Sequence, residues 1–173
     1  MSKVLIVVDM QNDFVYENLG TIEAQNIVPN IVNKVVEARQ NGDIVIFTKD
    51  VHHDEYYDTI EGKYVPPHCR GGESGSAIIP ELTAYADHIL YKSTYGTFGW
   101  ADYSHLFNEV DEIELCGVCT DICVVSNALI LRSMYPTTQL CVDASCCAGL
   151  SYEKHEAALS VMQSCNIKVM YPF

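Results

Sequence analysis

A chain of 173 residues is the length of one ordinary domain, and about half of its residues are apolar, enough to form a full hydrophobic core. Its 23 acidic and 10 basic residues give a formal charge of −13, which repels nucleic-acid backbones and anionic lipid surfaces. No apolar run reaches the length of a membrane span or of a signal-peptide core. We therefore expect a single domain, residues 1–173, in the cytoplasm, without nucleic-acid or membrane partners.

The sequence contains eight cysteines, most of them in or beside apolar runs. Disulfide frameworks stabilise chains that are too small to build a core, and this chain is not that small. A free cysteine in an apolar run behaves as a small buried hydrophobic residue. We therefore expect reduced thiols.

Short apolar runs rich in valine and isoleucine recur along the chain, as in buried parallel strands. In chain order they are 4–10 (VLIVVDM), 44–50 (IVIFTKD), 88–92 (HILYK), 112–118 (EIELCGV), 138–144 (TQLCVDA) and 167–173 (IKVMYPF). Segments 24–40, 120–133 and 152–164 place apolar residues at three- and four-residue spacings, which predicts amphipathic crossover helices. The alternation predicts an α/β fold with a doubly wound, mainly parallel six-stranded sheet and helices on both faces.

The first apolar run ends at Asp9, where a carboxylate is costly to bury without a partner. Lys92 ends the third run. Ligands of open α/β sheets bind beyond the carboxyl ends of the strands, so these two side chains can meet there as an ion pair if both strands are central. The pair can be catalytic, or it can be an ordinary structural salt bridge.

The region from Val51 to Leu82 breaks the alternation with paired prolines, paired glycines and several histidines and carboxylates, and we interpret it as a long functional loop. Asp50 and His52 lie two residues apart, so an extended segment points both to one side, and the prolines stiffen the approach to His68. Imidazole and carboxylate groups suit Zn²⁺, Mn²⁺ or Fe²⁺. A solvated surface is the alternative interpretation of these loop histidines.

Cys123 lies in GVCTDICVVSNA, where a strand ends and a helix begins at Thr120 or Asp121. Its sulfur is then in the first helical turn, where unpaired N–H groups and the helix dipole stabilise a thiolate. The alternatives are a buried core cysteine, a C-G-V-C redox motif that uses Cys116, and a domain that binds a metal or ligand without turnover.

Three separated motifs together resemble the isochorismatase-like cysteine hydrolases, a superfamily that includes nicotinamidases, N-carbamoylsarcosine amidases and isochorismatases. VVDMQNDF resembles the opening strand with its catalytic aspartate, KSTYGTF resembles the lysine segment, and GVCTDICV resembles the nucleophile turn. Order and spacing also fit, from Val4 to about Ser145. The resemblance implies the fold of that superfamily and a homo-oligomer.

The resemblance also implies a role for each matching residue. Asp9 corresponds to the general base, Lys92 to the cation that orients it, and Cys123 to the nucleophile. Cys119 follows a non-proline cis peptide in the family, which makes the Val118–Cys119 bond the candidate for that geometry. The backbone N–H groups of Cys119 and Cys123 would then form an oxyanion hole.

In nicotinamidases a D-x-H pair and the histidine of a P-P-H motif bind the metal that holds the ring nitrogen of the substrate. Asp50, His52 and His68 match those positions. Glu61 and His53 are the candidates for a fourth ligand. The resemblance therefore implies a divalent metal, zinc in the first place, with manganese or iron as alternatives.

Nicotinamidases often carry an aromatic residue just before P-P-H, where this chain has Val65. The aromatic residues that can supply a ring wall instead are Phe14, Tyr64, Tyr95, Phe98 and Trp100, although each also suits ordinary packing. We predict that Phe14, Val65 and Tyr95 contact the substrate. The predicted reaction is hydrolysis of the C–N bond of a small amide through a thioester, with nicotinamide first and with carbamoyl or ureido amides or isochorismate as alternatives.

Overall fold

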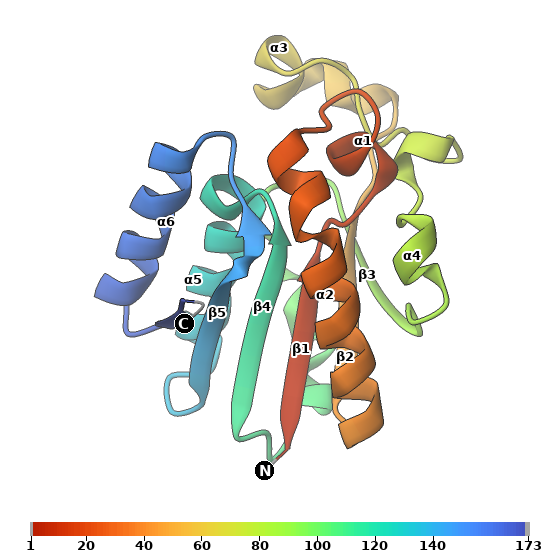
Figure 1. The fold of residues 1–173 in the computed structure, drawn as a ribbon. Helices are drawn as coiled ribbons and strands as arrows, with labels where there is room; N and C mark the ends of the chain where they lie inside the picture. Colours follow the sequence, from red (N-terminus) through yellow and green to blue (C-terminus); the bar gives the residue numbers. More distant parts are fainter. Residues whose placement is uncertain (1, 172–173) are drawn as a thin grey trace.

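The computed structural model describes residues 2–171, which form a six-stranded sheet in the order β3-β2-β1-β4-β5-β6 (Figure 1). The strands are β1 (Lys3–Val8), β2 (Ile44–Asp50), β3 (His88–Lys92), β4 (Glu112–Val118), β5 (Gln139–Ala148) and β6 (Lys168–Met170). Every strand pairing among the described residues is parallel. The predicted doubly wound sheet is confirmed, and it is parallel throughout. The last predicted strand, 167–173, ends in two residues that lie outside the described part.

Helices cover both faces of the sheet, as predicted (Figure 1). The α-helices are α1 (Asn12–Val15), α2 (Ile22–Asn41), α3 (Glu61–Tyr64), α4 (Pro80–Thr83), α5 (Val125–Met134) and α6 (Tyr152–Ser164). The connections from β1 and from β4 leave the centre of the sheet in opposite directions, so right-handed crossovers place α2 on one face and α5 and α6 on the other. Within residues 2–171, no helix is long and apolar enough to cross a membrane.

The ends of the crossover helices follow local sequence signals. The hydroxyl of Thr21 accepts the N–H of Ala24 at 3.1 Å at the start of α2, and Ser151 caps α6 in the same way. Gly42 ends α2 with a φ of 78°, a conformation that favours glycine. Only the helix predicted over 120–133 begins differently, because its first turn, η5 (Thr120–Val124), is a π-helical turn that precedes α5.

The strand order reverses between β1 and β4, the two central strands. Gly117 in β4 has a φ of 117°, and a Cβ atom on it would lie 2.1 Å from the carbonyl oxygen of Val8. Only glycine therefore allows the two strands to approach this closely. Doubly wound sheets bind ligands at such a reversal, beyond the carboxyl ends of the strands. The end of β1 and the turn η5 meet at this point.

The segment from Val51 to Leu82 is a loop of short turns rather than a structureless connection. It contains η1 (Asp54–Asp58), α3, η2 (Ser74–Ser76) and the start of α4. An isolated bridge joins its His52 to Arg70, and another joins its Ile78 to Gln11. In Figure 1 the part that carries α3 stands beyond the carboxyl ends of the strands, over the reversal point.

Candidate active site

Three side chains predicted from the sequence meet beyond the ends of the central strands. The Nζ atom of Lys92 lies 2.7 Å from Oδ2 of Asp9 and 3.7 Å from Sγ of Cys123. Asp9 is fully buried, and Lys92 and Cys123 are each only 6% exposed. The ammonium group thus lies between the carboxylate and the thiol, and the structure brings the predicted catalytic residues together.

Burial controls the protonation of this group. It raises the pKa of Asp9 above its ordinary value, although the charge of Lys92 opposes the shift. Burial disfavours the charge on Lys92, but the negative charges of the Asp9 and Asp50 carboxylates favour it, and the pKa of Lys92 is raised. Burial, followed by the negative charge of Asp9, also raises the pKa of the Cys123 thiol well above its ordinary value.

The sulfur of Cys123 lies in the first turn, η5, as predicted. Burial and the neighbouring carboxylate of Asp9 raise the pKa of the thiol. The stabilisation of a thiolate by the start of the helix stays a prediction. A thiol with a raised pKa needs a base before it can attack, and the carboxylate of Asp9 lies beside it.

Thr48 is a site residue that the sequence interpretation missed. Its hydroxyl donates to Oδ1 of Asp9 at 2.6 Å and accepts the backbone N–H of Asp9 at 3.1 Å, and Thr48 is fully buried. These two bonds orient the carboxylate so that Oδ2 faces Lys92. The available signal was a lone hydroxyl among apolar residues in the strand that pairs with β1.

The turn η5 contains the predicted oxyanion donors. The peptide bond between Val118 and Cys119 is cis, which confirms that prediction. The carbonyl of Cys119 accepts the N–H of Val124 at 3.1 Å, which closes the turn around Cys123. Cys119 is half-buried and lines the same pocket as Cys123. The use of the Cys119 and Cys123 amides as an oxyanion hole stays a prediction.

Asn127 is a second residue that the sequence interpretation missed. It is fully buried, and its Nδ2 donates to the carbonyls of Cys123 at 2.8 Å and Tyr95 at 3.1 Å. Its Oδ1 accepts the indole N–H of Trp100 at 2.9 Å. Asn127 therefore ties the nucleophile turn to the segment that carries Tyr95.

A pocket of about 160 Å³ opens onto Cys123. Phe14, Val65 and Tyr95, which were predicted to contact the substrate, all line it. Drug-sized ligands occupy pockets of roughly 300–1,000 Å³, so this one suits a molecule the size of a single ring.

Three other aromatic candidates lie elsewhere. Trp100 is fully buried in the core, and Tyr64 and Phe98 are 84% and 85% exposed. None of the three lines the pocket. Of the five aromatic candidates, only Phe14 and Tyr95 therefore line the pocket.

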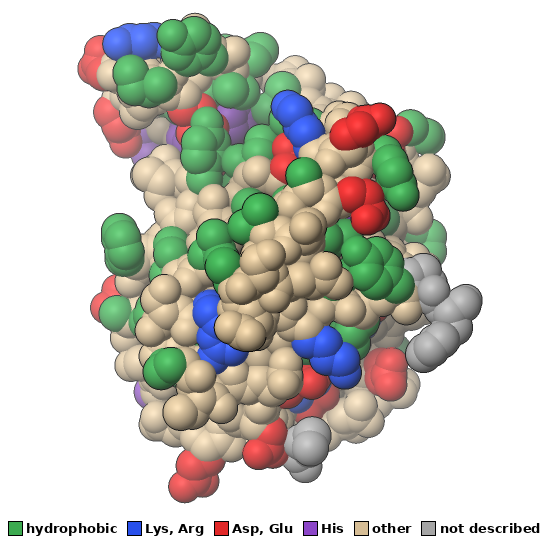
Figure 2. Space-filling model, turned by 90° about the vertical axis from the view of Figure 1, so that its left-hand side faces the viewer, with side chains coloured by type: hydrophobic (Ala, Val, Ile, Leu, Met, Phe, Trp, Pro, Cys, Tyr) green, Lys and Arg blue, Asp and Glu red, His purple; other side chains and the backbone are tan. Residues whose placement is uncertain are grey.

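Three of the predicted metal ligands, Asp50, Glu61 and His68, line the pocket, and His52 lies beside them. Donor atoms of Asp50, His52 and His68 all lie within 4.8 Å of one another. Oδ2 of Asp50 is 3.1 Å from Nε2 of His52 and 3.7 Å from Nε2 of His68, which is also 3.7 Å from Oε1 of Glu61. Figure 2 shows histidine and acidic side chains gathered beneath the lobe that carries α3.

These side chains fit a divalent metal. Nδ1 of His68 lies 2.9 Å from the carbonyl of Pro66, to which it can only donate, so Nε2 is the ring nitrogen available to a metal, and it faces the carboxylates of Asp50 and Glu61. Two imidazoles and two carboxylates form a mixed nitrogen and oxygen set that suits Zn²⁺. His53, the other candidate ligand, is exposed and lies outside the cluster.

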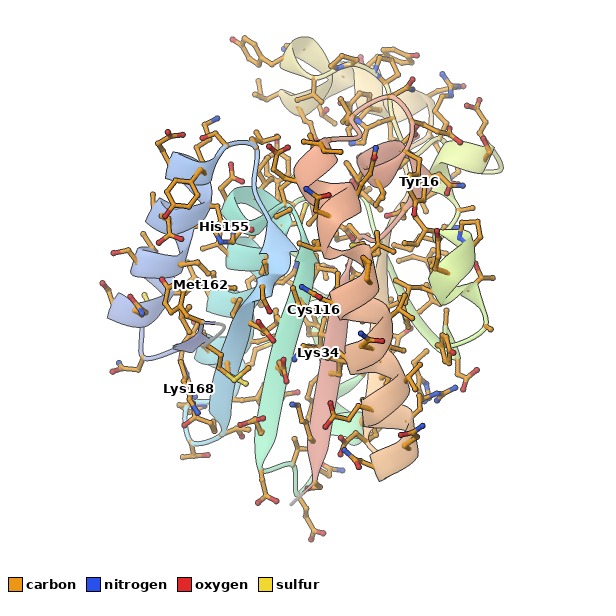
Figure 3. The ribbon with its side chains drawn as sticks, in the orientation of Figure 1. Tyr16, Lys34, Cys116, His155, Met162 and Lys168 are labelled. Atoms are coloured by element: carbon orange, nitrogen blue, oxygen red, sulfur yellow. The ribbon has the colours of Figure 1, made fainter. Side chains whose placement is uncertain are left out.

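The redox alternative fails on position. Cys116 is fully buried in β4, beside α2 (Figure 3), and it does not line the pocket. Burial raises the pKa of its thiol well above the ordinary value. A redox pair needs an accessible thiol of low pKa, so C-G-V-C is not such a motif here.

Comparison with known proteins agrees with the site. The isochorismatase domain family matches residues 3–171. A Bacillus subtilis (strain 168) protein of this family is 31% identical over 92% of this chain and 93% of its own. The chain therefore belongs to the isochorismatase family, which confirms the predicted resemblance and the hydrolase class.

Two solved structures are similar over nearly their whole length. A pyrazinamidase/nicotinamidase from Streptococcus mutans has a TM-score of 0.86 and 30% identity, covering 98% of this chain and 100% of that one. A pyrazinamidase of Pyrococcus horikoshii, solved in complex with zinc, has a TM-score of 0.85 and 27% identity, covering 99% and 100%. Both similar enzymes are named for the hydrolysis of small ring amides.

Proposed function

We propose that this protein hydrolyses nicotinamide, or a similarly small aromatic amide, to the carboxylic acid and ammonia. In this proposal Cys123 is the nucleophile, Asp9 the general base, and Lys92 the cation that orients Asp9. The observation that carries the proposal is the contact chain Asp9–Lys92–Cys123 at a pocket of about 160 Å³, with Asp50 and His68 in its other wall. The similar solved enzymes named pyrazinamidase/nicotinamidase support the choice of substrate.

The first step forms a bond between sulfur and carbon. Asp9 takes the thiol proton of Cys123 as the sulfur attacks the carbonyl carbon, and the C=O electron pair moves to oxygen. The N–H groups of Cys119 and Cys123 hold the resulting oxyanion. Lys92 keeps its proton, because its raised pKa leaves it charged, and stabilises the thiolate as it forms.

The second step breaks the C–N bond. The oxyanion re-forms the carbonyl, the nitrogen leaves with the proton that Asp9 held, and ammonia departs from a thioester on Cys123. Asp9 then takes a proton from a water molecule as the water oxygen attacks the thioester. When the C–S bond breaks, Asp9 returns that proton to the sulfur of Cys123. One water is consumed, and both side chains return to their starting states.

Asp50, His52 and His68, with Glu61 beside them, would hold a divalent metal, for which zinc is our proposal. Zinc is the metal in the similar P. horikoshii structure, and manganese or iron suits the same donors. When bound, such an ion offers an open coordination position to a ring nitrogen of the substrate. Phe14, Val65 and Tyr95 would pack on the ring and exclude water from it.

Ammonia release from a panel of amides tests the proposal. Nicotinamide, pyrazinamide and a carbamoyl amide are compared, with isochorismate followed separately. Cys123→Ala is expected to lose at least about 10³-fold in turnover, whereas Cys165→Ala, a half-buried cysteine at the end of α6, keeps the wild-type rate. Full activity of Cys123→Ala refutes the nucleophile, and a strong preference for the carbamoyl amide refutes only the choice of substrate.

We also propose that the protein works in the cytoplasm as a homo-oligomer. All eight cysteines are free, as expected in a reducing compartment. The oligomer rests on the family resemblance alone. Light scattering on purified protein gives its mass, and a single-chain mass at working concentration contradicts this part of the proposal.

A further inference from the structure

The motif that supplies Asp9 also supplies Gln11 and Asp13, which take no part in the chemistry above. Gln11 is fully buried, and Asp13 is 4% exposed. We infer that Gln11 and Asp13 are positioning residues that hold the backbone of two metal-ligand segments, those of Asp50 and His68. This inference rests on the metal site of the proposed function.

Gln11 binds both backbone polar groups of Asp50. Its Oε1 accepts the N–H of Asp50 at 2.7 Å, and its Nε2 donates to the carbonyl of Asp50 at 2.8 Å and to that of Ser76 at 2.9 Å. The β1–β2 pairing ends at Val7 and Phe47, so the side chain of Gln11 does for Asp50 what a neighbouring strand would do. Only an amide side chain offers a donor and an acceptor together in this shape.

Asp50 needs this support because its two carboxylate oxygens face different partners. Oδ1 lies 3.5 Å from Nζ of Lys92, and Oδ2 lies 3.1 Å from Nε2 of His52. A shift of the backbone would weaken both contacts at once, and binding sites tolerate displacements of only about 0.5 Å. Gln11 therefore holds the residue that joins the metal site to the catalytic group.

Asp13 holds the other segment. Its Oδ2 accepts the N–H of Cys69, the residue after His68, at 2.6 Å, a hydrogen bond strengthened by the charge of the carboxylate. The loop closes tightly around this carboxylate, since a Cβ on Gly75 would lie 2.1 Å from it. The ring of Phe14, the next residue, packs edge-on against the ring of His68 with centroids 5.2 Å apart.

Asn12, between these two residues, is a natural control. Its Nδ2 donates to the carbonyl of Ser74 at 2.9 Å, so it binds the same loop with a bond of the same kind. It contacts neither Asp50 nor Cys69 through that side chain. Loss of the Asn12 bond should therefore affect the stability of the loop without affecting the metal ligands.

The test measures zinc affinity in competition with a chromogenic chelator, on metal-free protein, together with the unfolding temperature. We expect Gln11→Met and Asp13→Ala each to weaken zinc binding by about 10–100-fold, the usual effect of losing the support behind a ligand. Gln11→Glu should weaken it similarly, because a carboxylate has no donor for the two carbonyls. Asp13→Asn keeps an acceptor for the Cys69 N–H and should restore near-wild-type affinity, and Asn12→Ala should leave affinity unchanged.

Each outcome decides a different question. A wild-type protein that binds no zinc overturns the proposed metal site itself. A wild-type protein that binds zinc, with Gln11→Met and Asp13→Ala binding as tightly as Asn12→Ala, overturns only the present inference. Equal losses in all three variants, in step with their unfolding temperatures, show a general structural role and also overturn it. If Gln11→Met fails to fold, the isosteric Gln11→Glu decides alone, and unchanged affinity there refutes the role of Gln11.

Discussion

The pocket has two chemically distinct walls that are built in different ways. Asp9, Lys92 and Cys123 are far apart in the chain and meet at the carboxyl end of the parallel sheet. Asp9 follows the central strand β1, Lys92 ends the edge strand β3, and Cys123 lies in η5 after the central strand β4. Glu61 and His68 come instead from one loop of short turns. The strand register places the catalytic group, whereas individual side-chain bonds place the metal group.

Asp50 belongs to both walls, because it ends β2 and contacts Lys92 as well as His52. The difference predicts that the two walls can be disabled separately. A change in the catalytic group should stop the reaction and leave metal binding intact. A change in the loop group should remove the metal and leave the nucleophile reactive.

The largest effect is expected for Asp9→Asn. The variant keeps the shape of the side chain and removes the base, so turnover should fall by about 10³-fold. Zinc content by elemental analysis should stay at the wild-type level, because Asp9 does not contact the loop histidines. Loss of zinc together with activity would show that the walls are not separable.

The double variant His52→Ala, His68→Ala reverses this pattern. Removal of two imidazoles should abolish zinc binding and lower kcat/KM for nicotinamide by about 10²-fold. Cys123 should still react with iodoacetamide at the wild-type rate, as followed by peptide mass spectrometry. If Cys123 became unreactive in this variant, the catalytic wall would depend on the loop group, which would contradict the separation of the two walls.

The pH dependence of kcat/KM in Thr48→Val tests the role of Asp9 in the catalytic wall. Asp9 must be ionised to accept the thiol proton, and burial raises its pKa, so wild-type activity should fall on the acid side above the range of ordinary carboxyl groups. The hydrogen bond from Thr48 favours the ionised form, and its loss should raise that pKa further. The acid limb of kcat/KM should therefore move to higher pH, with about a tenfold loss of activity.

Thr48→Ser keeps the hydroxyl and serves as the control for that profile. Its acid limb should coincide with that of the wild type. An acid limb that stays in place in Thr48→Val would mean that Asp9 is not the titrating group.

The smallest effect concerns the fourth ligand. Glu61→Gln removes a charge that lies 3.7 Å from Nε2 of His68 and should weaken zinc binding by about tenfold. His53→Ala should have no effect, since His53 is exposed and outside the cluster. The reverse order of effects would reassign the ligand to His53.

The difference between placement by strands and placement by individual side-chain bonds also explains which site residues could be predicted from the sequence. Asp9 and Lys92 could be placed together because parallel strands bring their carboxyl ends to one edge of the sheet. Family resemblance placed Asp50, His52 and His68, whose mutual distances now agree with a shared site. From residue spacing alone, these loop histidines could also belong to a solvated surface.

The missed residues act through bonds that leave no pattern in a sequence. Thr48 and Asn127 are common residue types, and their importance comes from which buried atoms they reach across the fold. The pKa of Cys123 could not be predicted for a related reason. A helix start is visible in a sequence, but the desolvation and the nearby carboxylate that raise the pKa of the thiol are properties of the assembled pocket.

The position of β1 at the centre of the sheet has a consequence for biosynthesis. β1 can pair with β2 once α2 has formed, but its other edge has no partner until Glu112–Val118 emerges from the ribosome. Until then a strand that is apolar from Val4 to Val8 presents open backbone groups, a surface of the kind that chaperones shield. Asp9 and Cys123 lie on either side of this junction, so the proposed reaction requires the β1–β4 pairing to have formed.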